Sequence, residues 1–506
     1  MDDIQKLCLD TIEKGKQAIV FVPSRASAEK TAEQVAKLTS VFYPEFKDEV
    51  LKAASSPTRQ CKRLGSCVHK GVAFHHAGLM QKQKDLIEEE FKSGKIRIIA
   101  ATTTIAAGLS MPVFRVIIKS LKRFSNWGMD WIPVLEYLQM AGRAGRPEYE
   151  KFGESIVIAK NLAEKDEIYE KYVCGEPEEI YSKLAVEPVL RMYVLSLVSS
   201  GIVRDEQGLK EFFSKTFWAH QFEDMAKLES IMEKMIGLLQ EWNFIQGARS
   251  DFVAADSLDS KEQRLLRSTR LGKRVSELYL DPLTAKHLLD CMEKHNENKD
   301  VFSILQMISN TLEMRPLLRV KAKEEEFVQG ELIKNYEHLL MEEPSAFDLE
   351  YNDFMNSIKT SLYFTSWIDE IEEDLLLEKF NIRPGEIRIK NNTADWLLYA
   401  CEELGGMLEK RAFVTEVRKL RVRIKHGVKE EVLPLLKLKG VGRVRARKLF
   451  SNGIRDLGGI KSTDLTTLGQ IVGGKLAVDL KRQVGVEVKE IISSKKRVGQ
   501  MSLNKF

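Results

Sequence analysis

The chain has 506 residues, of which 43% are hydrophobic and 30% are charged. Such a length is enough for roughly three or four domains at about 100–200 residues each. The longest apolar runs are too short or too interrupted to cross a bilayer, and no N-terminal signal pattern is visible, so we expect a soluble globular protein. Six scattered cysteines without a CxxC pair favour reduced thiols inside a cell.

The net charge is +4, but its distribution along the chain is uneven. Residues 411–506 contain 23 Lys and Arg against 8 Asp and Glu, whereas residues 341–380 contain 11 Asp and Glu against 2 Lys. A basic end of this kind predicts contact with nucleic acid or another polyanion. A merely solvated basic surface is the alternative that composition leaves open.

The first 160 residues alternate between helical and strand patterns. Helices are predicted at 4–15, 25–38 and 80–94. Strands are predicted at 17–24, 71–78, 96–103, 115–121 and 153–159. Short apolar strands between helices are typical of an open α/β sheet of parallel strands, whose ligands bind at the carboxyl ends of the strands.

From about residue 175 the pattern is mostly helical. Helices are predicted at 179–203 and 224–245, with short strands near 252–255 and 265–272. Helices beside a two-stranded wing suggest a winged helix. The stretch 281–430 is predicted to be helical throughout, and a small helical unit and a polar tail follow it.

The stretch QMAGRAGRP at 139–147 places Arg143 and Arg146 three residues apart among small side chains. Arginines so placed are suited to gripping a phosphate during its transfer, which requires a cradle for a nucleotide. The stretch 469–476 has the spacing of a phosphate-binding loop up to Lys475, but Leu476 lacks the hydroxyl that binds magnesium. We therefore interpret it as a turn, and we find no acidic stretch of the DExH type.

Five metal-binding residue types lie close together in the sequence: Cys61, Cys67, His69, His75 and His76. Their spacings fit no closed zinc motif, so we expect no metal site. The interpretation that we favour is a pair of buried thiols beside a functional histidine loop.

Four stretches carry a resemblance to a known family: VFVPSR at 20–25, GVAFHHAGL at 71–79, ATTTIAAGLSMP at 101–112 and QMAGRAGRP at 139–147. Together they resemble the second motor domain of superfamily 2 helicases, most closely the archaeal Hjm/HelQ-type DNA repair helicases of the Ski2-like group. SKTFWAHQ and LGKRVSELYLDPLTA are similar to that family's winged-helix region. In the family, a first motor domain with the phosphate-binding loop and the DExH pair precedes this region. The resemblance therefore implies the C-terminal part of such a helicase, a fragment or a split gene product, with the missing first motor domain in cis or in trans.

The resemblance also implies an α/β RecA-like domain followed by mostly α domains. The expected parts are a second RecA-like motor domain at 1–172, a winged-helix domain at 173–282, a helical ratchet domain at 283–430, a helix-hairpin-helix domain at 431–490 and a flexible tail at 491–506. The implied function is ATP-dependent 3′–5′ unwinding of forked or branched DNA in replication-coupled repair, in the cytoplasm of an archaeal cell and associated with its nucleoid. A non-enzymatic module that binds single-stranded or branched DNA, and an RNA helicase of the Ski2-like group, are the alternatives.

In the family, ATP and Mg²⁺ bind between the two motor domains, so this chain would bind them only with the missing first motor domain. Arg143 and Arg146 would neutralise the charge of the γ-phosphate as it leaves, and Gln139 would orient its neighbours. Gly108 and Gly142 would lie toward the nucleotide. The chain alone is expected to be inactive, and a helix N-terminus rich in small residues is the alternative interpretation of 139–146.

The resemblance places DNA contacts at two parts of the motor domain. Six residues would contact the backbone of the tracking strand: Arg25, His75, His76, Thr102, Thr103 and Thr104. A hairpin within 115–137 would part the duplex, with Phe124, Trp127 and Trp131 stacking on the last base pair. The alternatives are a structural role for the histidines and simple packing of the hairpin aromatics.

The family places a stacking tryptophan on a ratchet helix of the helical domain, and Trp396 matches it. The apolar stripe of this predicted helix consists of Leu397, Cys401, Leu404 and Leu408. The family uses an arginine about two turns earlier. Here Ile389 occupies that face, with Arg388 and Lys390 on either side as candidate contacts. Core filling by Trp396 is the alternative.

The stretch LKGVGRVRARKLF at 438–450 has the spacing of a helix-hairpin-helix. Gly440 and Gly442 let backbone amides face a phosphate, while Arg443, Arg445 and Arg447 add positive charge. The family carries a similar Arg-Ala-Arg element that grips the exiting strand and restrains the motor. We therefore expect this stretch to bind nucleic-acid backbone without reading its sequence.

In the tail, Gln500, Leu503 and Phe506 fall at i, i+3 and i+6. One helical turn places Leu503 and Phe506 on one side, with Gln500 reaching back to hydrogen-bond. This pattern is similar to the clamp-binding peptide of DNA replication and repair enzymes. It predicts a sliding clamp (PCNA) as a partner, with a frayed terminus as the alternative.

Overall fold

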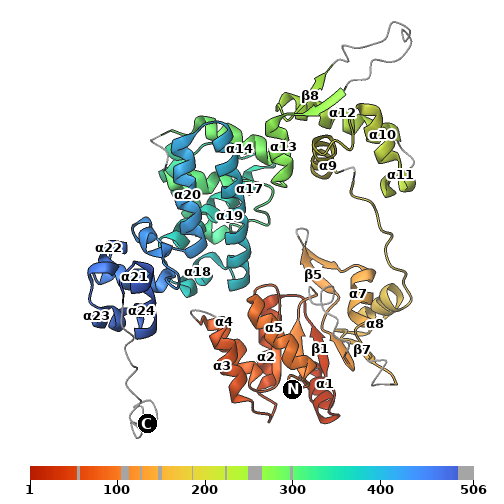
Figure 1. Ribbon diagram of the computed structural model, residues 1–506. Coiled ribbons are helices and arrows are strands. Elements are labelled where there is room, and N and C mark those ends of the chain that lie inside the picture. Colours follow the sequence, from red (N-terminus) through yellow and green to blue (C-terminus); the bar gives the residue numbers. More distant parts are fainter. Residues whose placement is uncertain are drawn as a thin grey trace. The chain divides into compact units, whose positions relative to one another are not determined.

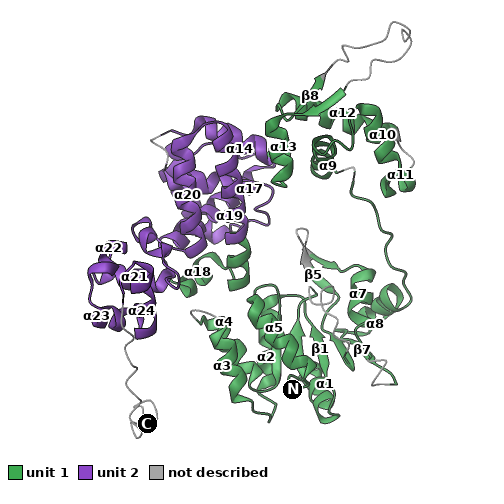
Figure 2. Ribbon diagram, in the orientation of Figure 1, with its two compact units in different colours: residues 1–283, 372–390 green, residues 284–371, 391–506 purple. Residues whose placement is uncertain are grey.

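The computed structural model describes residues 1–53, 57–103, 113–125, 128–145, 151–184, 186–222, 225–248, 265–296 and 300–487. Figure 1 shows its helices and strands, and Figure 2 shows the two compact units into which the chain divides. The first unit contains residues 1–283 and 372–390, and the second contains residues 284–371 and 391–506. Within the described ranges, no helix is both long enough and apolar enough to cross a membrane.

A five-stranded sheet forms the centre of the N-terminal part of the first unit, with the strand order β2-β3-β1-β4-β7. All neighbouring strands are parallel. Four of the strands are buried along their whole length, which explains why their sequences are almost continuously apolar. The five predicted strands are therefore confirmed: β1 (Ala18–Phe21), β2 (Val72–His75), β3 (Ile98–Ala101), β4 (Arg115–Ile118) and β7 (Glu154–Val157).

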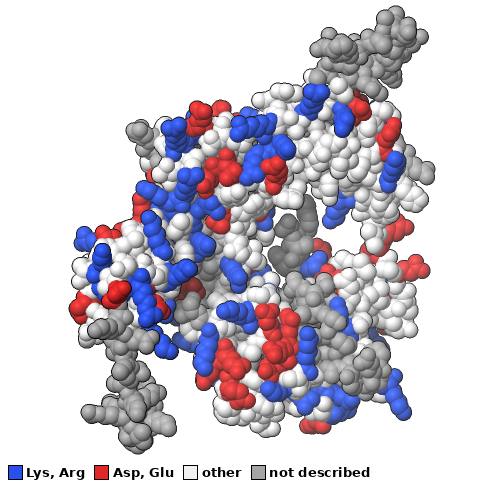
Figure 3. Space-filling model, viewed as in Figure 1, with Lys and Arg blue, Asp and Glu red and all other residues white. Residues whose placement is uncertain are grey.

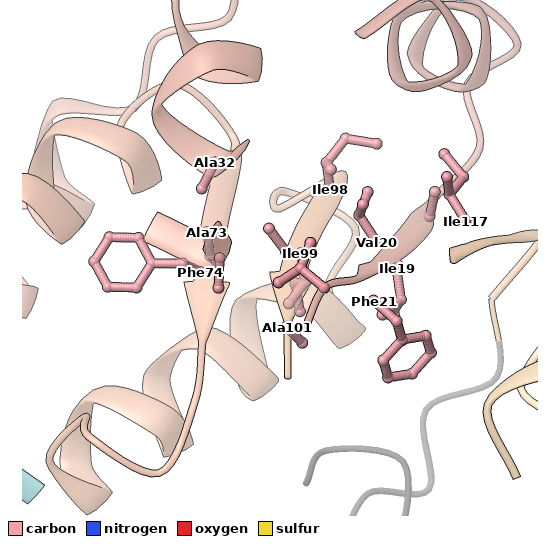
Figure 4. Close-up of a cluster of buried hydrophobic side chains, with 14 of the residues drawn as sticks. Ile19, Val20, Phe21, Ala32, Ala73, Phe74, Ile98, Ile99, Ala101 and Ile117 are labelled. Carbon is pink, nitrogen blue, oxygen red and sulfur yellow. The ribbon is translucent and has the colours of Figure 1, made fainter. Parts of the chain in front are cut away.

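Helices flank this sheet and share one apolar core with it. Figure 4 shows Ile19 and Ile99 on adjacent strands with Ala32 of a flanking helix nearby, and all three side chains are at most 2% exposed. The three predicted helices are confirmed, whereas α3 and α4 were not predicted. The helices of this region are α1 (Asp3–Glu13), α2 (Arg25–Ala36), α3 (Pro44–Lys52), α4 (Arg59–Val68), α5 (Gln81–Lys92), α7 (Val134–Ala141), α8 (Leu162–Ile168) and a π-helical turn η1 (Tyr169–Val173).

The predicted hairpin is also confirmed. Strands β5 (Lys122–Ser125) and β6 (Gly128–Trp131) pair antiparallel, with Lys122 opposite Trp131. The hairpin follows β4 directly and leads into α7, so it projects from the carboxyl end of a central strand.

Helices beside a two-stranded sheet form the rest of the first unit up to residue 283. The prediction of one helix over 179–203 is wrong at its start, because the helix begins at Glu187 with Pro188 in its first turn, where proline is tolerated. The strand that pairs with 265–268 lies at 245–248, and the predicted strand at 252–255 falls outside the described residues. The elements are α9 (Glu187–Ser199), α10 (Glu206–Ser214), α11 (Phe217–Phe222), α12 (Met225–Glu241), β8 (Ile245–Ala248), β9 (Leu265–Ser268) and α13 (Arg270–Glu277).

The region from 281 to 430 is mostly but not wholly helical. The prediction of helix throughout is wrong at 310–321 and 339–350, which contain turns and extended chain. The helix α19 contributes residues to both units. The helical elements are α14 (Pro282–Lys294), α15 (Val301–Ser309), η2 (Ala322–Glu324), α16 (Glu325–Asn335), η3 (Tyr336–His338), α17 (Tyr351–Ile368), α18 (Glu373–Phe380), α19 (Pro384–Met407) and α20 (Arg411–His426).

Residues from 428 onward form a small core of their own within the second unit. The stretch 469–476, which has the spacing of a phosphate-binding loop, contains the end of α23, the predicted turn at Gly473 and the start of α24. Gly473 occupies the turn with φ +92°, a conformation that favours glycine. The elements are η4 (Glu430–Lys437), α21 (Arg443–Ser451), α22 (Leu457–Ser462), α23 (Leu465–Val472) and α24 (Gly474–Gln483).

Candidate nucleic-acid and nucleotide interfaces

The carboxyl ends of β1, β3 and β4 meet at one edge of the five-stranded sheet. The loops after these strands and the base of the hairpin enclose a small pocket of about 30 Å³. Thr102 and Thr103 follow β3 and line it, together with Pro23 after β1 and Lys122 of the hairpin. Two threonines at the end of a parallel strand offer hydroxyls to a phosphate backbone, whereas the Lys122 ammonium is paired with Glu164 at 3.5 Å. Thr104, another predicted contact, lies outside the described residues.

The segment 139–145 is placed differently from the prediction. The alternative interpretation expected a helix N-terminus here, but Gln139 lies exposed in the last turn of α7 and Gly142 is the C-cap of that helix. The chain then runs beside Val113: the Val113 amide donates to the Arg143 carbonyl at 2.9 Å, and the Gly145 amide donates to the Val113 carbonyl at 2.6 Å.

These backbone hydrogen bonds hold Arg143, whose side chain is half-buried, in a fixed turn in front of β4. Gly145 has φ +96°, so the turn requires glycine there. Two other residues predicted for the nucleotide, Gly108 and Arg146, lie outside the described residues.

The two adjacent histidines are buried rather than presented to a ligand. His76 is 0% exposed; its Nδ1 accepts from the Gly78 amide at 3.1 Å, and its Nε2 lies 3.4 Å from Glu29. Because Nδ1 accepts, Nε2 carries the proton and donates to the carboxylate. Burial lowers the pKa of His76. Burial is also the main reason why the pKa of His75 falls to about 3. Both rings are therefore neutral, and their side chains have the structural role that the sequence left as the alternative.

Glu29 is the centre of this buried network, and no sequence pattern pointed to it. The side chain is 1% exposed and lies beside Arg63 and Arg383 as well as His76. Burial alone would raise the pKa of Glu29, but the hydrogen bond from His76 and the two guanidinium groups lower it to about 2. The carboxylate is therefore ionised at neutral pH.

We expect the substitution Glu29→Gln to make the first unit less stable and less sensitive to acid. A carboxylate with a lowered pKa stabilises the fold fully above its unfolded pKa, and this stabilisation is lost as the pH falls through about 2. The difference in unfolding free energy between the wild type and Glu29→Gln should therefore be about 3 kcal/mol at pH 6 and shrink as the pH falls from 4.5 toward 2. Hydrogen exchange of peptides from α2 and β2 measures it, and a difference that stays constant over this range would contradict the assignment.

Arg25 is engaged by a carboxylate rather than left open for a phosphate. Its guanidinium pairs with Glu386 in the first turn of α19. The Gly385 amide next to it donates to the Gly78 carbonyl at 2.9 Å. A Cβ at Gly385 would collide with the carbonyl oxygens of Ala77 and Leu79, so this close approach of two backbones requires glycine.

The base of the hairpin is fixed by its own side chains. The Trp131 indole Nε1 donates to Glu167 at 2.8 Å, and the Lys122 ammonium lies 3.9 Å from the centre of the Trp131 rings. Trp131 therefore packs the hairpin and is not free to stack on a base pair. The side chain of Phe124 and the whole of Trp127 lie outside what the structure describes.

The helix predicted to carry Trp396 is α19, and its apolar stripe is largely as predicted. Leu397, Cys401 and Leu404 are fully buried, but Leu408 is 36% exposed and follows the end of the helix. Trp396 is half-buried at the edge of the stripe.

The two candidate contacts nearer the start of α19 differ from each other. Arg388 is exposed. Lys390 is only 8% exposed, and burial lowers its pKa to about 8. Arg388 is therefore the one of the two with a side chain open to a ligand.

The three arginines of the stretch 438–450 are not equivalent. Arg447 pairs with Glu370 at 2.6 Å and with Glu431 at 2.9 Å, and its pKa is raised by these bonds. Arg443 lies 5.0 Å from the ring centre of Trp367 and donates to the Ile371 carbonyl at 2.7 Å.

Arg445 is the exposed member of the three, and it donates to the Gly440 carbonyl at 2.8 Å. Gly440 is exposed with φ +84°, and Gly442 is the N-cap of α21. The expectation that all three arginines face a phosphate is therefore wrong for Arg443 and Arg447, which bind the end of α17 and the loop after it.

Acidic side chains mark a face of the first unit that is unsuited to nucleic acid. Figure 3 shows them gathered over α3 and α5, where the sequence has Glu45 and Glu49 on α3 and Glu88 and Glu89 on α5. Among the described residues, no group of three or more His, Cys, Asp or Glu side chains is arranged to hold a metal ion. The tail residues Gln500, Leu503 and Phe506 lie outside the described residues.

Three family models match separate parts of the chain. Residues 1–148 match the helicase conserved C-terminal domain, residues 153–246 match a helix-turn-helix domain, and residues 302–427 match the archaeal helicase domain 4. These matches agree with a RecA-like domain built on a parallel sheet and followed by mostly helical parts.

Curated relatives match almost the whole chain. The ATP-dependent DNA helicase Hel308 of Methanocella arvoryzae is 37% identical over 502 residues, which cover 96% of this chain and 65% of the relative. The Hel308 proteins of Pyrococcus horikoshii and Pyrococcus abyssi are each 35% identical, over 97% and 98% of this chain and 67% and 68% of the relatives. The chain thus spans about two thirds of the length of the relatives that it matches. It belongs to the Hel308 family, whose matched members are named ATP-dependent DNA helicases.

Proposed function

We propose that the chain is the C-terminal part of an ATP-dependent 3′–5′ DNA helicase of the Hjm/HelQ type, which unwinds forked or branched DNA in repair. The observation that carries this proposal is the edge of the motor sheet, where Thr102 and Thr103 lie beside the base of the hairpin. A DNA strand that binds at these hydroxyls would lie next to the β5–β6 hairpin. Such an arrangement would let the chain hold one strand while the hairpin blocks its complement.

The described residues of this chain fit one part of a binding site for ATP and Mg²⁺, and they do not form the whole site. The glycine-rich stretch at 469–476 joins the helices α23 and α24 and does not follow a strand, so it does not form the strand–loop–helix cradle of a phosphate-binding loop. Arg143 is held in a rigid turn by Val113, as a residue that reaches toward a nucleotide on another domain would need to be. We therefore infer that Gln139, Gly142, Arg143 and Arg146 complete a site whose phosphate cradle is on a first motor domain.

We further propose the division into a motor domain at 1–172, a winged helix at 173–282, a ratchet domain at 283–430, a helix-hairpin-helix domain at 431–490 and a tail. The strand would contact Trp396 and Arg388 on α19, and Arg445 with the Gly440–Gly442 turn. Arg443 and Arg447 would position that turn through their contacts with α17 and its end. The tail residues Leu503 and Phe506 are proposed to bind a sliding clamp.

Trp396→Ala is expected to weaken the binding of single-stranded DNA by about 1–3 kcal/mol, because stacking on one base contributes about that much. Trp396→Phe is the matched variant, since it keeps an aromatic face and should retain most of the affinity. Fluorescence anisotropy with a labelled oligonucleotide measures both. Equal affinity of wild type and Trp396→Ala, with unchanged melting, would assign Trp396 to core packing.

A non-enzymatic DNA-binding module is the second candidate for the chain by itself. The observation in its favour is the lack of a phosphate cradle among the described residues. The two candidates separate when a first motor domain is added, because a helicase part would then support DNA-dependent ATP hydrolysis and a binding module would not. Competition between DNA and RNA strands of the same sequence tests the third possibility, an RNA helicase. The DNA helicase part and the DNA-binding module should both prefer the DNA strand.

A further inference from the structure

A hollow of about 550 Å³ lies in the C-terminal part of the second unit. It is open to solvent, and the end of η4 with the chain after it, the helix α22 and the end of α24 line it. Its lining residues are Lys437, Leu438, Lys439, Leu457, Gly458, Lys461, Gln483 and Val484. We call this hollow the lysine pocket.

Hydrogen bonds between these elements fix the walls of the lysine pocket. The Gln483 side chain accepts from the Lys439 amide at 2.7 Å and donates to the Lys439 carbonyl at 3.1 Å. Lys481 is 5% exposed, and its ammonium donates to the Lys461 carbonyl at 2.8 Å, which joins α24 to α22. The pocket is therefore formed before any ligand arrives, and a ligand would not need to order its walls.

The lysine pocket is strongly positive. Lys437, Lys439 and Lys461 are all exposed, and no acidic residue lines the pocket. The ion pairs of the neighbouring helices involve other groups, and none of the described carboxylates pairs with the three pocket ammonium groups. Figure 3 shows further basic side chains over α21 to α24. Three uncompensated cations around one hollow attract a polyanion.

The rest of the lining is apolar and suits a flat or hydrophobic group. Leu438, Leu457 and Val484 provide this surface, and Leu457 is 38% exposed. A volume of about 550 Å³ lies within the range of about 300–1,000 Å³ that is usual for small-ligand sites. An inorganic anion would leave the apolar part unused, whereas a nucleotide unit joins a phosphate to a base and a sugar.

We propose that the lysine pocket binds one phosphate-bearing nucleotide unit of a single DNA strand. The ammonium groups contact the phosphates, and the base or sugar lies over the leucines and Val484. The Gln483 amide is already engaged by Lys439, so the pocket grips the strand without reading its base sequence. This inference rests on the proposed DNA-binding function, and it adds a contact outside the Gly440–Gly442 turn.

The test measures the affinity of the full chain for fluorescein-labelled oligothymidylate at several salt concentrations. The triple variant Lys437→Ala, Lys439→Ala, Lys461→Ala is expected to bind about tenfold or more weakly at low salt. Its slope of log affinity against log salt should be shallower by about 0.7–1.4, because one nucleotide unit presents one or two phosphates and each lost contact changes the slope by about 0.7. The control triple Lys323→Ala, Lys334→Ala, Lys425→Ala removes the same charge from exposed sites outside the pocket and should keep the wild-type slope.

A second variant tests the pocket without removing a lysine. Leu457→Glu brings a negative charge into the pocket and is compatible with α22, because an acidic residue is favourable in the first turn of a helix. It should lower the affinity as the lysine triple does, with unchanged melting.

The outcomes distinguish a failure of the pocket proposal from a failure of the proposed DNA-binding function. Wild-type affinity in both the pocket triple and Leu457→Glu would overturn the pocket while strand binding by the wild type stands. No binding by the wild type would instead overturn the proposed function. Inorganic pyrophosphate that binds the wild-type pocket, with unchanged strand affinity in the pocket triple, would mark a site for free anions and also overturn the inference.

Discussion

Arg143→Ala is expected to lower the rate of DNA-dependent ATP hydrolysis by about 10³–10⁵-fold when the chain is joined to a first motor domain from a Hel308 relative. In the proposed role, the Arg143 guanidinium neutralises charge that develops on the γ-phosphate, so its loss acts on the turnover rate rather than on ATP binding. The turn that carries Arg143 is held by hydrogen bonds between backbone groups of Val113, Arg143 and Gly145. Since these bonds use no side chain of Arg143, the alanine variant should keep the turn.

Arg143→Lys is the matched variant for this experiment. Lysine keeps the positive charge but lacks the planar fork that holds a phosphate at two points, so hydrolysis should recover only in part. Steady-state hydrolysis and ATP affinity are measured for both variants. Wild-type turnover in Arg143→Ala would show that the arginine has no part in hydrolysis.

Arg191→Ala is expected to destabilise the helix-turn-helix part of the first unit by about 3–5 kcal/mol. The guanidinium of Arg191 in α9 donates to both carboxylate oxygens of Asp281, at 2.8 and 2.9 Å. The two side chains are only 5% and 6% exposed. Removing the arginine would leave a buried carboxylate without its partner, and burial already raises the pKa of Asp281.

The double variant Arg191→Met, Asp281→Leu is the control, because it removes both charges and fills the space with apolar groups. It should recover much of the lost stability. Hydrogen exchange of peptides from α9 and α12 reports on this part of the chain, and protection should fall more than about a hundredfold in Arg191→Ala. Equal loss in the single and double variants would show that the buried pair contributes through packing instead.

The elements that the sequence predicts well are those whose pattern is local. The buried strands of the motor sheet are short apolar runs between helices, and they lie where the pattern placed them. The hairpin β5–β6 could be predicted because its two strands are adjacent in the sequence and pair with each other. The helices α3 and α4 were missed, and both are short, with nine and ten residues.

The functional side chains are harder to predict because their partners are distant in the sequence. Arg447 looks free for DNA in the stretch RVRAR, yet its carboxylate partner Glu370 lies 77 residues earlier. His76 looks exposed in a loop motif but is closed off by Glu29. Arg25 likewise pairs with Glu386, which lies 361 residues later in the chain. Charge and spacing identify such residues, whereas only the fold shows which of them are already paired.

The most direct test of the account is an equilibrium titration of the folded 506-residue chain with labelled single-stranded DNA, in the absence of nucleotide. The contacts proposed for Thr102, Trp396, Arg445 and the lysine pocket are all made by this chain and need no ATP. The account therefore predicts binding that weakens steeply as the salt concentration rises, in proportion to the phosphates contacted. A folded chain that does not bind the strand at low salt would contradict it.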